Sequence, residues 1–82
     1  MLKVYIKPGC PWCIEAVDWL QKRGYAFEEI NVFADPRHFD RMRQISGQSR
    51  APTLETESGI VLADFDVDQL AAFLEANRIT AP

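Results

Sequence analysis

Hydrophobic and polar residues follow two different periods along this chain, and the two periods predict strands and helices in turn. Residues 2–6, Leu-Lys-Val-Tyr-Ile, alternate with a period of two, which indicates a half-buried strand. Residues 27–32 predict a second strand, and residues 53–56 and 60–63 predict two more. A Ser-Gly pair at 58–59 is typical of a tight turn, so the last two strands are expected to form a hairpin.

The first helix is predicted directly after the first strand. Pro11 suits the first helical position, because its missing N–H group would be unpaired there in any residue. Ile14, Val17 and Leu20 recur at helical spacing, and we expect them to form the buried face. Gly24 then ends this helix.

Two further helices have clear start signals. Asp35 followed by Pro36 is typical of a helix N-terminus, and Gly47 ends that helix. Asp66 and Gln69 have the spacing of a capping box at the start of the last helix. The expected core faces are Phe39, Met42 and Ile45 in the second helix, and Leu70, Phe73 and Leu74 in the third.

The order of these elements predicts an α/β fold. A strand–helix–strand opening followed by a second helix, a hairpin and a last helix indicates a small mixed sheet with helices on both faces. The chain has 82 residues, of which 48% are hydrophobic and 26% charged, which is ordinary for a globular domain. We expect one domain spanning residues 1–82.

The charge distribution excludes some classes of partner. The net charge is −3, and the acidic excess lies after residue 49. A nucleic-acid-binding domain is expected to carry a basic patch, which this sequence does not suggest. No apolar stretch approaches the length of a membrane span or of a signal peptide's hydrophobic region. We therefore expect a cytoplasmic protein that binds neither nucleic acid nor membrane.

The two cysteines of the chain, Cys10 and Cys13, lie where the first strand gives way to the first helix. A disulfide between them would close a loop of two intervening residues, which stabilises a fold very little. Redox chemistry and metal binding remain. Zinc usually takes four protein ligands, and His38 is the only histidine available to join the two sulfurs. The position of the pair favours redox chemistry, and we expect no resident metal.

The two cysteines are expected to have different roles. Cys10 falls at the helix N-terminus, where free N–H groups and the helix dipole stabilise a thiolate, and Lys7 can add positive charge. Cys13 lies one turn into the helix and is expected to be more buried. Cys10 is therefore the predicted nucleophile that attacks a disulfide, and Cys13 the thiol that resolves the mixed disulfide.

Two segments of the chain together resemble the glutaredoxin family. Residues 7–13, Lys-Pro-Gly-Cys-Pro-Trp-Cys, are similar to the family's active-site signature, in which Tyr is usual in place of Trp12. Residues 50–53, Arg-Ala-Pro-Thr, are similar to its cis-proline segment. The resemblance covers essentially the whole chain. It implies a thioredoxin-like fold, a four-stranded mixed sheet flanked by three helices, with the first strand in the centre.

The resemblance also implies a substrate groove. A cis bond is expected before Pro52, and the backbone of Ala51 is expected to pair with a bound peptide as an added strand would. Trp12, between the cysteines, is expected to be exposed and to contact the partner. Arg50 is expected to contact a carboxylate of the ligand. The turn at 65–66, with Phe65 and Asp66, is expected to close the groove.

At this turn the sequence departs from the usual pattern of the family. An ungapped comparison puts Leu62 and Ala63 where the family has a Gly-Gly pair that receives the γ-glutamyl end of glutathione. Asp66 keeps the acidic residue that follows, but Asp64 and Asp68 add negative charge around it. Because glutathione carries two carboxylates, these charges are expected to weaken its binding.

The implied function is thiol–disulfide exchange. The protein is expected to be a monomer without a tightly bound cofactor, and to reduce protein disulfides or glutathione mixed disulfides through Cys10 and Cys13. Glutathione is the expected co-substrate. One alternative is a small redoxin reduced by a flavoprotein of the thioredoxin-reductase type. Another is an iron–sulfur cluster carrier that works as a glutathione-bridged dimer, and a weaker one is a zinc-bridged interaction module.

Overall fold

A computed structural model describes residues 1–82 and contains seven elements in the predicted order. They are β1 (Leu2–Ile6), α1 (Pro11–Lys22), β2 (Phe27–Asn31), α2 (Pro36–Ser46), β3 (Thr53–Glu55), β4 (Val61–Ala63) and α3 (Val67–Ala76). β2, β3 and β4 are each one residue shorter than predicted, and β1 has the predicted bounds.

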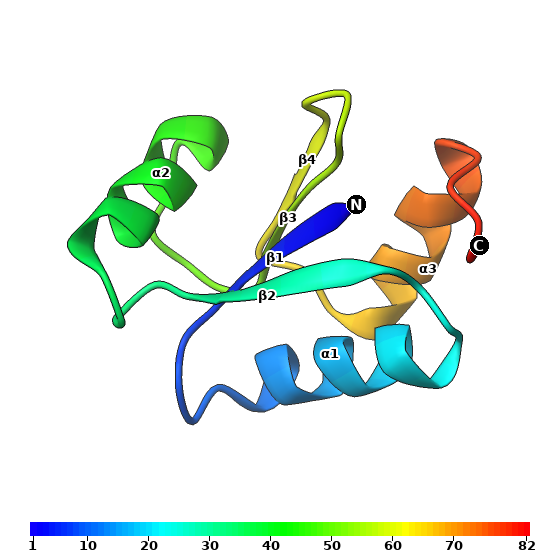
Figure 1. Ribbon diagram of the computed structural model, residues 1–82, viewed down its shortest axis with the longest axis horizontal. Coiled ribbons are helices and arrows are strands. Elements are labelled where there is room, and N and C mark those ends of the chain that lie inside the picture. Colours follow the sequence, from blue (N-terminus) through cyan, green and yellow to red (C-terminus); the bar gives the residue numbers. More distant parts are fainter.

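The four strands form one mixed sheet in the order β2-β1-β3-β4. β1 pairs with β2 in parallel and with β3 in antiparallel fashion, and β3 pairs with β4 in antiparallel fashion. The parallel pair needs a crossover connection, which α1 supplies. β1 therefore lies inside the sheet, as predicted, and the loop that follows it leads straight into α1 (Figure 1).

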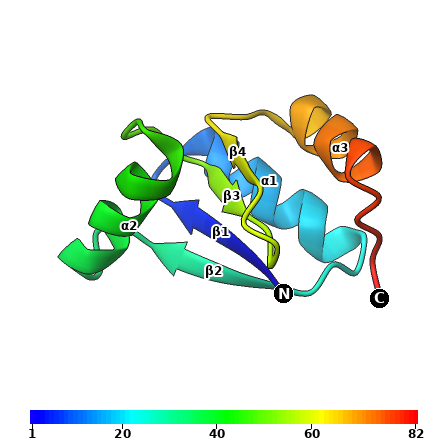
Figure 2. The ribbon, with the colours of Figure 1, turned by 90° about the horizontal axis from the view of Figure 1, so that it is seen from above.

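The alternation of β1 divides the hydrophobic core between the two faces of the sheet. Leu2 and Val4 belong to a cluster that also holds buried residues of α1 and α3. Tyr5 belongs to a second cluster on the face that α2 covers, together with Ile30 and Met42. Helices therefore cover both faces of the sheet, with α2 on one side and α1 and α3 on the other (Figure 2).

The predicted core face of α1 is partly wrong. Its buried residues are Cys13, Ala16 and Leu20, whereas Ile14 is 63% exposed. Cys13, Ala16 and Leu20 share a face because they are spaced by three and four positions. The buried face thus carries the small side chains of Cys13 and Ala16, and the larger Ile14 points outward.

A polar group is buried between β1, β3 and α2. The hydroxyl of Tyr5 donates a hydrogen bond to Oε1 of Glu55 at 3.0 Å, and Nη2 of Arg41 donates to Oε2 at 2.8 Å. Tyr5 and Glu55 are both buried. Every buried side-chain oxygen and nitrogen in the structure has a hydrogen-bond partner, as stable cores require.

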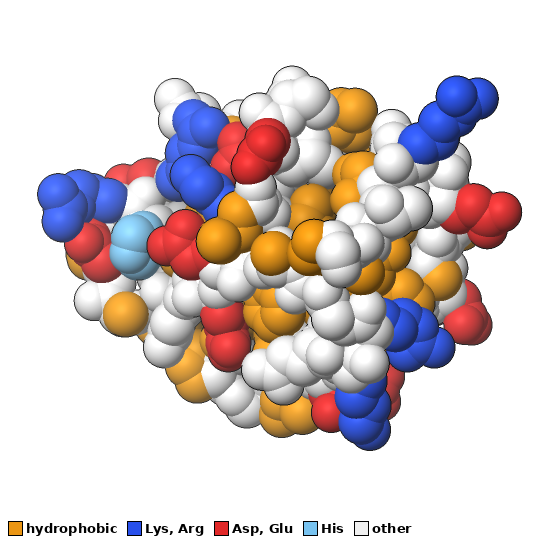
Figure 3. All heavy atoms as spheres, turned by 45° about the vertical axis from the view of Figure 1, so that its right-hand side comes forward, with side chains coloured by type: hydrophobic (Ala, Val, Ile, Leu, Met, Phe, Trp, Pro, Cys, Tyr) orange, Lys and Arg blue, Asp and Glu red, His pale blue; other side chains and the backbone are white.

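The surface mixes both signs of charge. On the face shown in Figure 3, hydrophobic side chains gather near the middle, and acidic and basic side chains are interspersed around them. This face carries no extended patch of either sign. None of the three helices is long and apolar enough to span a membrane.

Candidate active site

Cys10 is the N-cap residue of α1. Its backbone is extended (φ −87°, ψ 113°), and its Sγ atom accepts a hydrogen bond from the N–H group of Cys13 at 3.3 Å. The side chain is partly exposed, and the cysteines are free thiols. A sulfur at this position accepts an N–H hydrogen bond and faces the positive end of the helix dipole, and both stabilise the thiolate.

Cys13 lies in a different environment. It is 2% exposed. Burial, with a smaller contribution from the hydrogen bond with Cys10, raises the pKa of the Cys13 thiol from 9.0 to about 12. Cys13 is therefore protonated at neutral pH, whereas the sulfur of Cys10 is the one that a partner can reach.

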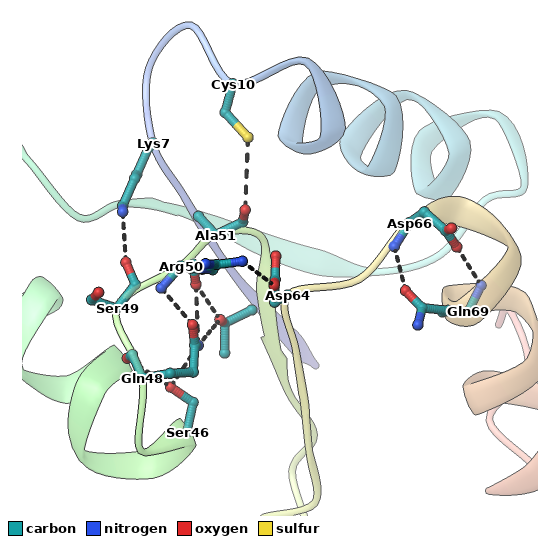
Figure 4. A network of polar contacts seen from close by, with 11 residues as sticks. Lys7, Cys10, Ser46, Gln48, Ser49, Arg50, Ala51, Asp64, Asp66 and Gln69 are labelled. Carbon is teal, nitrogen blue, oxygen red and sulfur yellow. Dashed lines mark hydrogen bonds and ion pairs between the residues drawn. The ribbon is translucent and has the colours of Figure 1, made fainter.

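The Ala51–Pro52 segment faces Cys10. The peptide bond before Pro52 is cis, as the family resemblance implied, and Pro52 itself is fully buried. The Sγ atom of Cys10 lies 3.8 Å from the carbonyl oxygen of Ala51 (Figure 4). The carbonyl of Ala51 thus lies directly beside the sulfur of Cys10, and the pairing of its backbone with a bound peptide stays a prediction.

Gln48 organises the loop that carries Ala51, and this residue is not among those predicted from the sequence. Its Nε2 atom donates to the Oγ atoms of Ser46 and Thr53 and to the carbonyl of Arg50, at 2.9–3.1 Å. Its Oε1 atom accepts from the N–H group of Arg50. No motif marks this residue; the one available signal is an amide side chain directly after the helix-ending Gly47.

Lys7 holds the same loop from the other side. Its ammonium group donates to the carbonyl of Ser49 and lies 5.5 Å from the centre of the Phe39 ring. The direct contact of Lys7 is thus with the loop rather than with the sulfur of Cys10 (Figure 4). Stabilisation of the Cys10 thiolate by Lys7 therefore remains a prediction that rests on its positive charge alone.

One groove of about 490 Å³ brings most of the predicted site together. Its size lies within the range of small-molecule sites. Seven of the nine predicted site residues line it, and buried Cys13 and Pro52 do not. The lining residues are Lys7, Cys10, Pro11, Trp12, Arg50, Ala51, Asp64, Phe65, Asp66 and Gln69.

The groove residues differ in what they can offer a ligand. Trp12 is 59% exposed, as predicted, so its ring is free to contact a partner. Phe65 is 2% exposed and packs into the core, so only its backbone is available to the groove. The carboxylate of Asp66 accepts from the N–H group of Gln69 at 2.8 Å, and Gln69 returns a bond to Asp66. This is the predicted capping box, which opens α3 at the edge of the groove.

An ion pair crosses the groove next to Ala51. Nη1 of Arg50 lies 3.4 Å from Oδ2 of Asp64, and both side chains are well exposed. The backbone of Asp64 is left-handed (φ 54°), and its N–H group donates to the carbonyl of Pro52 at 2.9 Å. Both residues stand out in the sequence, but no sequence pattern predicts that they pair.

The structure contains no cluster of three or more His, Cys, Asp or Glu side chains that could hold a metal ion. The site instead combines the sulfurs of Cys10 and Cys13 with a backbone segment that lies beside the more exposed sulfur, that of Cys10. Four charged side chains line the groove around them: Lys7, Arg50, Asp64 and Asp66. This arrangement is suited to attack on a disulfide sulfur carried by an extended peptide or by a small molecule.

The fold and the paired cysteines define a thioredoxin-like protein. The structure superimposes with a TM-score of 0.80 on the crystal structure of the thioredoxin-like protein BC3987, which is 28% identical; the match covers 90% of this chain and all of that one. Residues 2–61 match the family model described as Glutaredoxin. The chain therefore belongs to the glutaredoxin family.

Two curated relatives illustrate the range of proteins that this chain resembles. A glutaredoxin-like protein from the rubredoxin operon of Clostridium pasteurianum is 32% identical over 62 residues, which cover 76% of this chain and 83% of that protein. The global transcriptional regulator Spx 1 of Oceanobacillus iheyensis is 30% identical over 74 residues. That match covers 85% of this chain but only 56% of the regulator.

Proposed function

We propose that this protein is a thiol–disulfide oxidoreductase that reduces protein disulfides or mixed disulfides of glutathione. The observation that carries the proposal is the position of Cys10. Its sulfur is accessible, accepts the N–H bond of Cys13, and faces the backbone of Ala51 across a groove. Membership of the glutaredoxin family supports thiol redox chemistry at such a pair.

The reaction takes place in two exchanges of sulfur partners. The Cys10 thiolate attacks one sulfur of a substrate disulfide; that S–S bond breaks, and the departing thiolate takes up a proton. Cys13 then loses its proton and attacks the Cys10 sulfur of the mixed disulfide. The second substrate thiolate leaves, and a Cys10–Cys13 disulfide remains. Two electrons have passed from the protein to the substrate.

The high pKa of Cys13 separates these two steps. Because Cys13 is a neutral thiol at neutral pH, it does not compete with Cys10 for the incoming disulfide. The backbone N–H group of Cys13 donates a hydrogen bond to the sulfur of Cys10, so the two residues are held together on one helical turn and the resolving attack is intramolecular. The pair therefore favours attack through Cys10 and release through Cys13.

The groove supplies the contacts that position the substrate. Ala51 presents its backbone beside Cys10, where an extended peptide can add to it in the manner of a strand. Trp12 offers an exposed ring in the lining of the same groove. We assign these two residues to the recognition of the peptide around the substrate's cysteine.

Two electron donors are candidates for restoring the dithiol. Glutathione is favoured by the family, and a flavoprotein of the thioredoxin-reductase type is the alternative that the acidic turn at 64–66 leaves open. In either case two electrons convert the Cys10–Cys13 disulfide back to two thiols. We place this cycle in the cytoplasm, where thiols are kept reduced, and expect the protein to act as a monomer.

The test uses two single variants that serve as controls for each other. Cys10→Ser should lose reduction of both a protein disulfide and a glutathionylated peptide, because the attacking sulfur is gone. Cys13→Ser should lose reduction of the protein disulfide and keep reduction of the glutathionylated peptide, because glutathione can resolve the mixed disulfide. Assays with glutathione and with a thioredoxin reductase would identify the donor. Equal activity of the two variants would contradict the assigned roles.

A further inference from the structure

The groove is lined by two cations, of which Arg50 is the more exposed. Four charged residues line the groove: Lys7, Arg50, Asp64 and Asp66. The ammonium group of Lys7 is hydrogen-bonded to the carbonyl of Ser49 and lies beside aromatic rings. Arg50 is therefore the cation most available to a ligand, and its side chain is 77% exposed.

Asp64 is placed so that it neutralises this cation. Its carboxylate lies 3.4 Å from Nη1 of Arg50, and its N–H bond to Pro52 fixes the backbone that carries it (Figure 4). Asp66 adds a second carboxylate to the same end of the groove, although that carboxylate is engaged in capping α3. A negatively charged ligand that reaches Arg50 must displace Asp64 or remain close to its charge.

We propose that Asp64 is a specificity-determining residue, which directs the groove towards neutral or cationic thiols and away from anionic ones such as glutathione. This inference rests on the proposed function, because it concerns which thiol reacts at Cys10. A carboxylate beside the incoming anion raises the free energy of its approach, and the ion pair withholds the guanidinium that would otherwise attract it. A neutral thiol experiences neither effect.

The reaction that tests this is reduction of the oxidised protein by small thiols. A thiolate attacks Cys10 of the Cys10–Cys13 disulfide; the S–S bond breaks, and Cys13 leaves and takes up a proton. A second thiol molecule attacks the mixed disulfide, which releases a small-molecule disulfide and returns Cys10 as a thiol. Each cycle oxidises two thiol molecules and reduces one protein disulfide.

The experiment compares thiols of different charge: glutathione and mercaptosuccinate as anions, 2-mercaptoethanol as a neutral thiol and cysteamine as a cation. The variant is Asp64→Asn, because asparagine keeps the size of the side chain and tolerates the left-handed backbone of this position. The control is Asp68→Asn, which removes the same charge from an exposed position outside the groove.

Asp64→Asn should raise the rate for each anionic thiol relative to that for 2-mercaptoethanol by about two- to fivefold, the size expected for one exposed charge pair. The relative rate for cysteamine should fall. Added salt should reduce both changes. Asp68→Asn should give smaller changes. A uniform effect on all four thiols, or equal effects of the two variants, would overturn the proposal.

A second variant tests the role of Arg50. Arg50→Gln should reduce the relative rate for glutathione more strongly in the Asp64→Asn background than in the parent protein, because Asp64 masks Arg50 only in the parent. If the effects of Arg50→Gln and Asp64→Asn on the relative rate for glutathione are simply additive, then Asp64 does not mask Arg50 and the proposal is overturned. If no form of the protein reacts with thiols, the proposed function itself fails. If all forms react with unchanged preference, the role of Asp64 alone fails.

Discussion

The carbonyl oxygen of Ala51 lies 3.8 Å from the Sγ atom of Cys10, although 41 positions separate the two residues in the chain. The sheet brings them together. β1 ends before the Cys10 loop, and β3 begins after Ala51 as its antiparallel neighbour, so the two loops meet at one end of the sheet. The reactive sulfur and its neighbouring backbone are therefore supplied by different segments, each with its own supports.

Gln48 is expected to be the main support of the second segment. Gln48→Ala removes the amide that holds Ser46, Arg50 and Thr53 together, so the protein should lose about 1–2 kcal/mol of stability. The value of kcat/KM for a glutathionylated peptide should fall several-fold, because the backbone of Ala51 is less firmly placed. Thermal unfolding and initial rates measure the two effects.

The matched control is Gln44→Ala, which makes the same change at an exposed position of α2. This variant should stay close to the parent protein in both measurements. If the two variants cannot be told apart, the hydrogen bonds of Gln48 do not position the loop.

The buried thiol of Cys13 should make the reduced protein sensitive to alkali. Its pKa is raised by burial from 9.0 to about 12, so above pH 9 the unfolded chain loses this proton while the folded protein keeps it. The resulting stability is fully present below pH 9 and is lost as the pH rises towards 12. The slope approaches about 1.4 kcal/mol per pH unit.

Urea unfolding of the reduced protein from pH 7 to pH 11, in parallel with Cys13→Ala, isolates this contribution from that of other groups. The stability difference between the two proteins should shrink steadily above pH 9. A difference that stays constant over this range would show that Cys13 titrates normally in the folded protein.

Asp66 allows a structural role to be separated from a role in ligand binding. Asp66→Ala removes the cap of α3 and should cost about 1 kcal/mol, whereas Asp66→Asn keeps a capping oxygen and should cost much less. Calorimetry measures both. If Asp66→Asn changes the reaction with glutathione while stability is kept, then the carboxylate also acts on the ligand; if only Asp66→Ala has an effect, the residue is a cap alone.

The buried carboxylate of Glu55 should be important for stability but not for thiol chemistry. Glu55→Gln leaves Arg41 without its ionic partner and weakens the bond from Tyr5, so we expect a loss of about 1–3 kcal/mol. Arg41→Met should cost more, because it leaves the buried carboxylate of Glu55 without its cationic partner, whereas half of the Arg41 side chain is in water and can be solvated when Glu55 is neutralised. Equilibrium unfolding compares the two variants, and a greater loss for Glu55→Gln would contradict this account.

Most of the fold could be predicted from the sequence, because strand alternation, proline starts and glycine stops are local signals. The core face of α1 could not be fully predicted, because Cys13 and Ala16 bury small side chains while the larger Ile14 faces solvent. The cysteines and Pro52 belong to recognisable motifs. The Arg50–Asp64 pair joins residues 14 positions apart. The hydrogen bonds of Gln48 reach only nearby residues, but they depend on the conformation of an irregular loop that no sequence pattern specifies.

The two hydrophobic clusters on opposite faces of the sheet have unequal sizes, with eight buried residues on the side of α1 and α3 and four on the side of α2. Fewer buried side chains hold α2, so its amide protons should exchange with solvent sooner than those of α1. The chain runs from α2 directly into the loop that carries Gln48 and Ala51. Local opening of α2 would therefore displace the loop that carries Ala51, while both sulfurs stay in place on α1. During each opening the cysteines would still react with disulfides, but the groove would select among substrates less well.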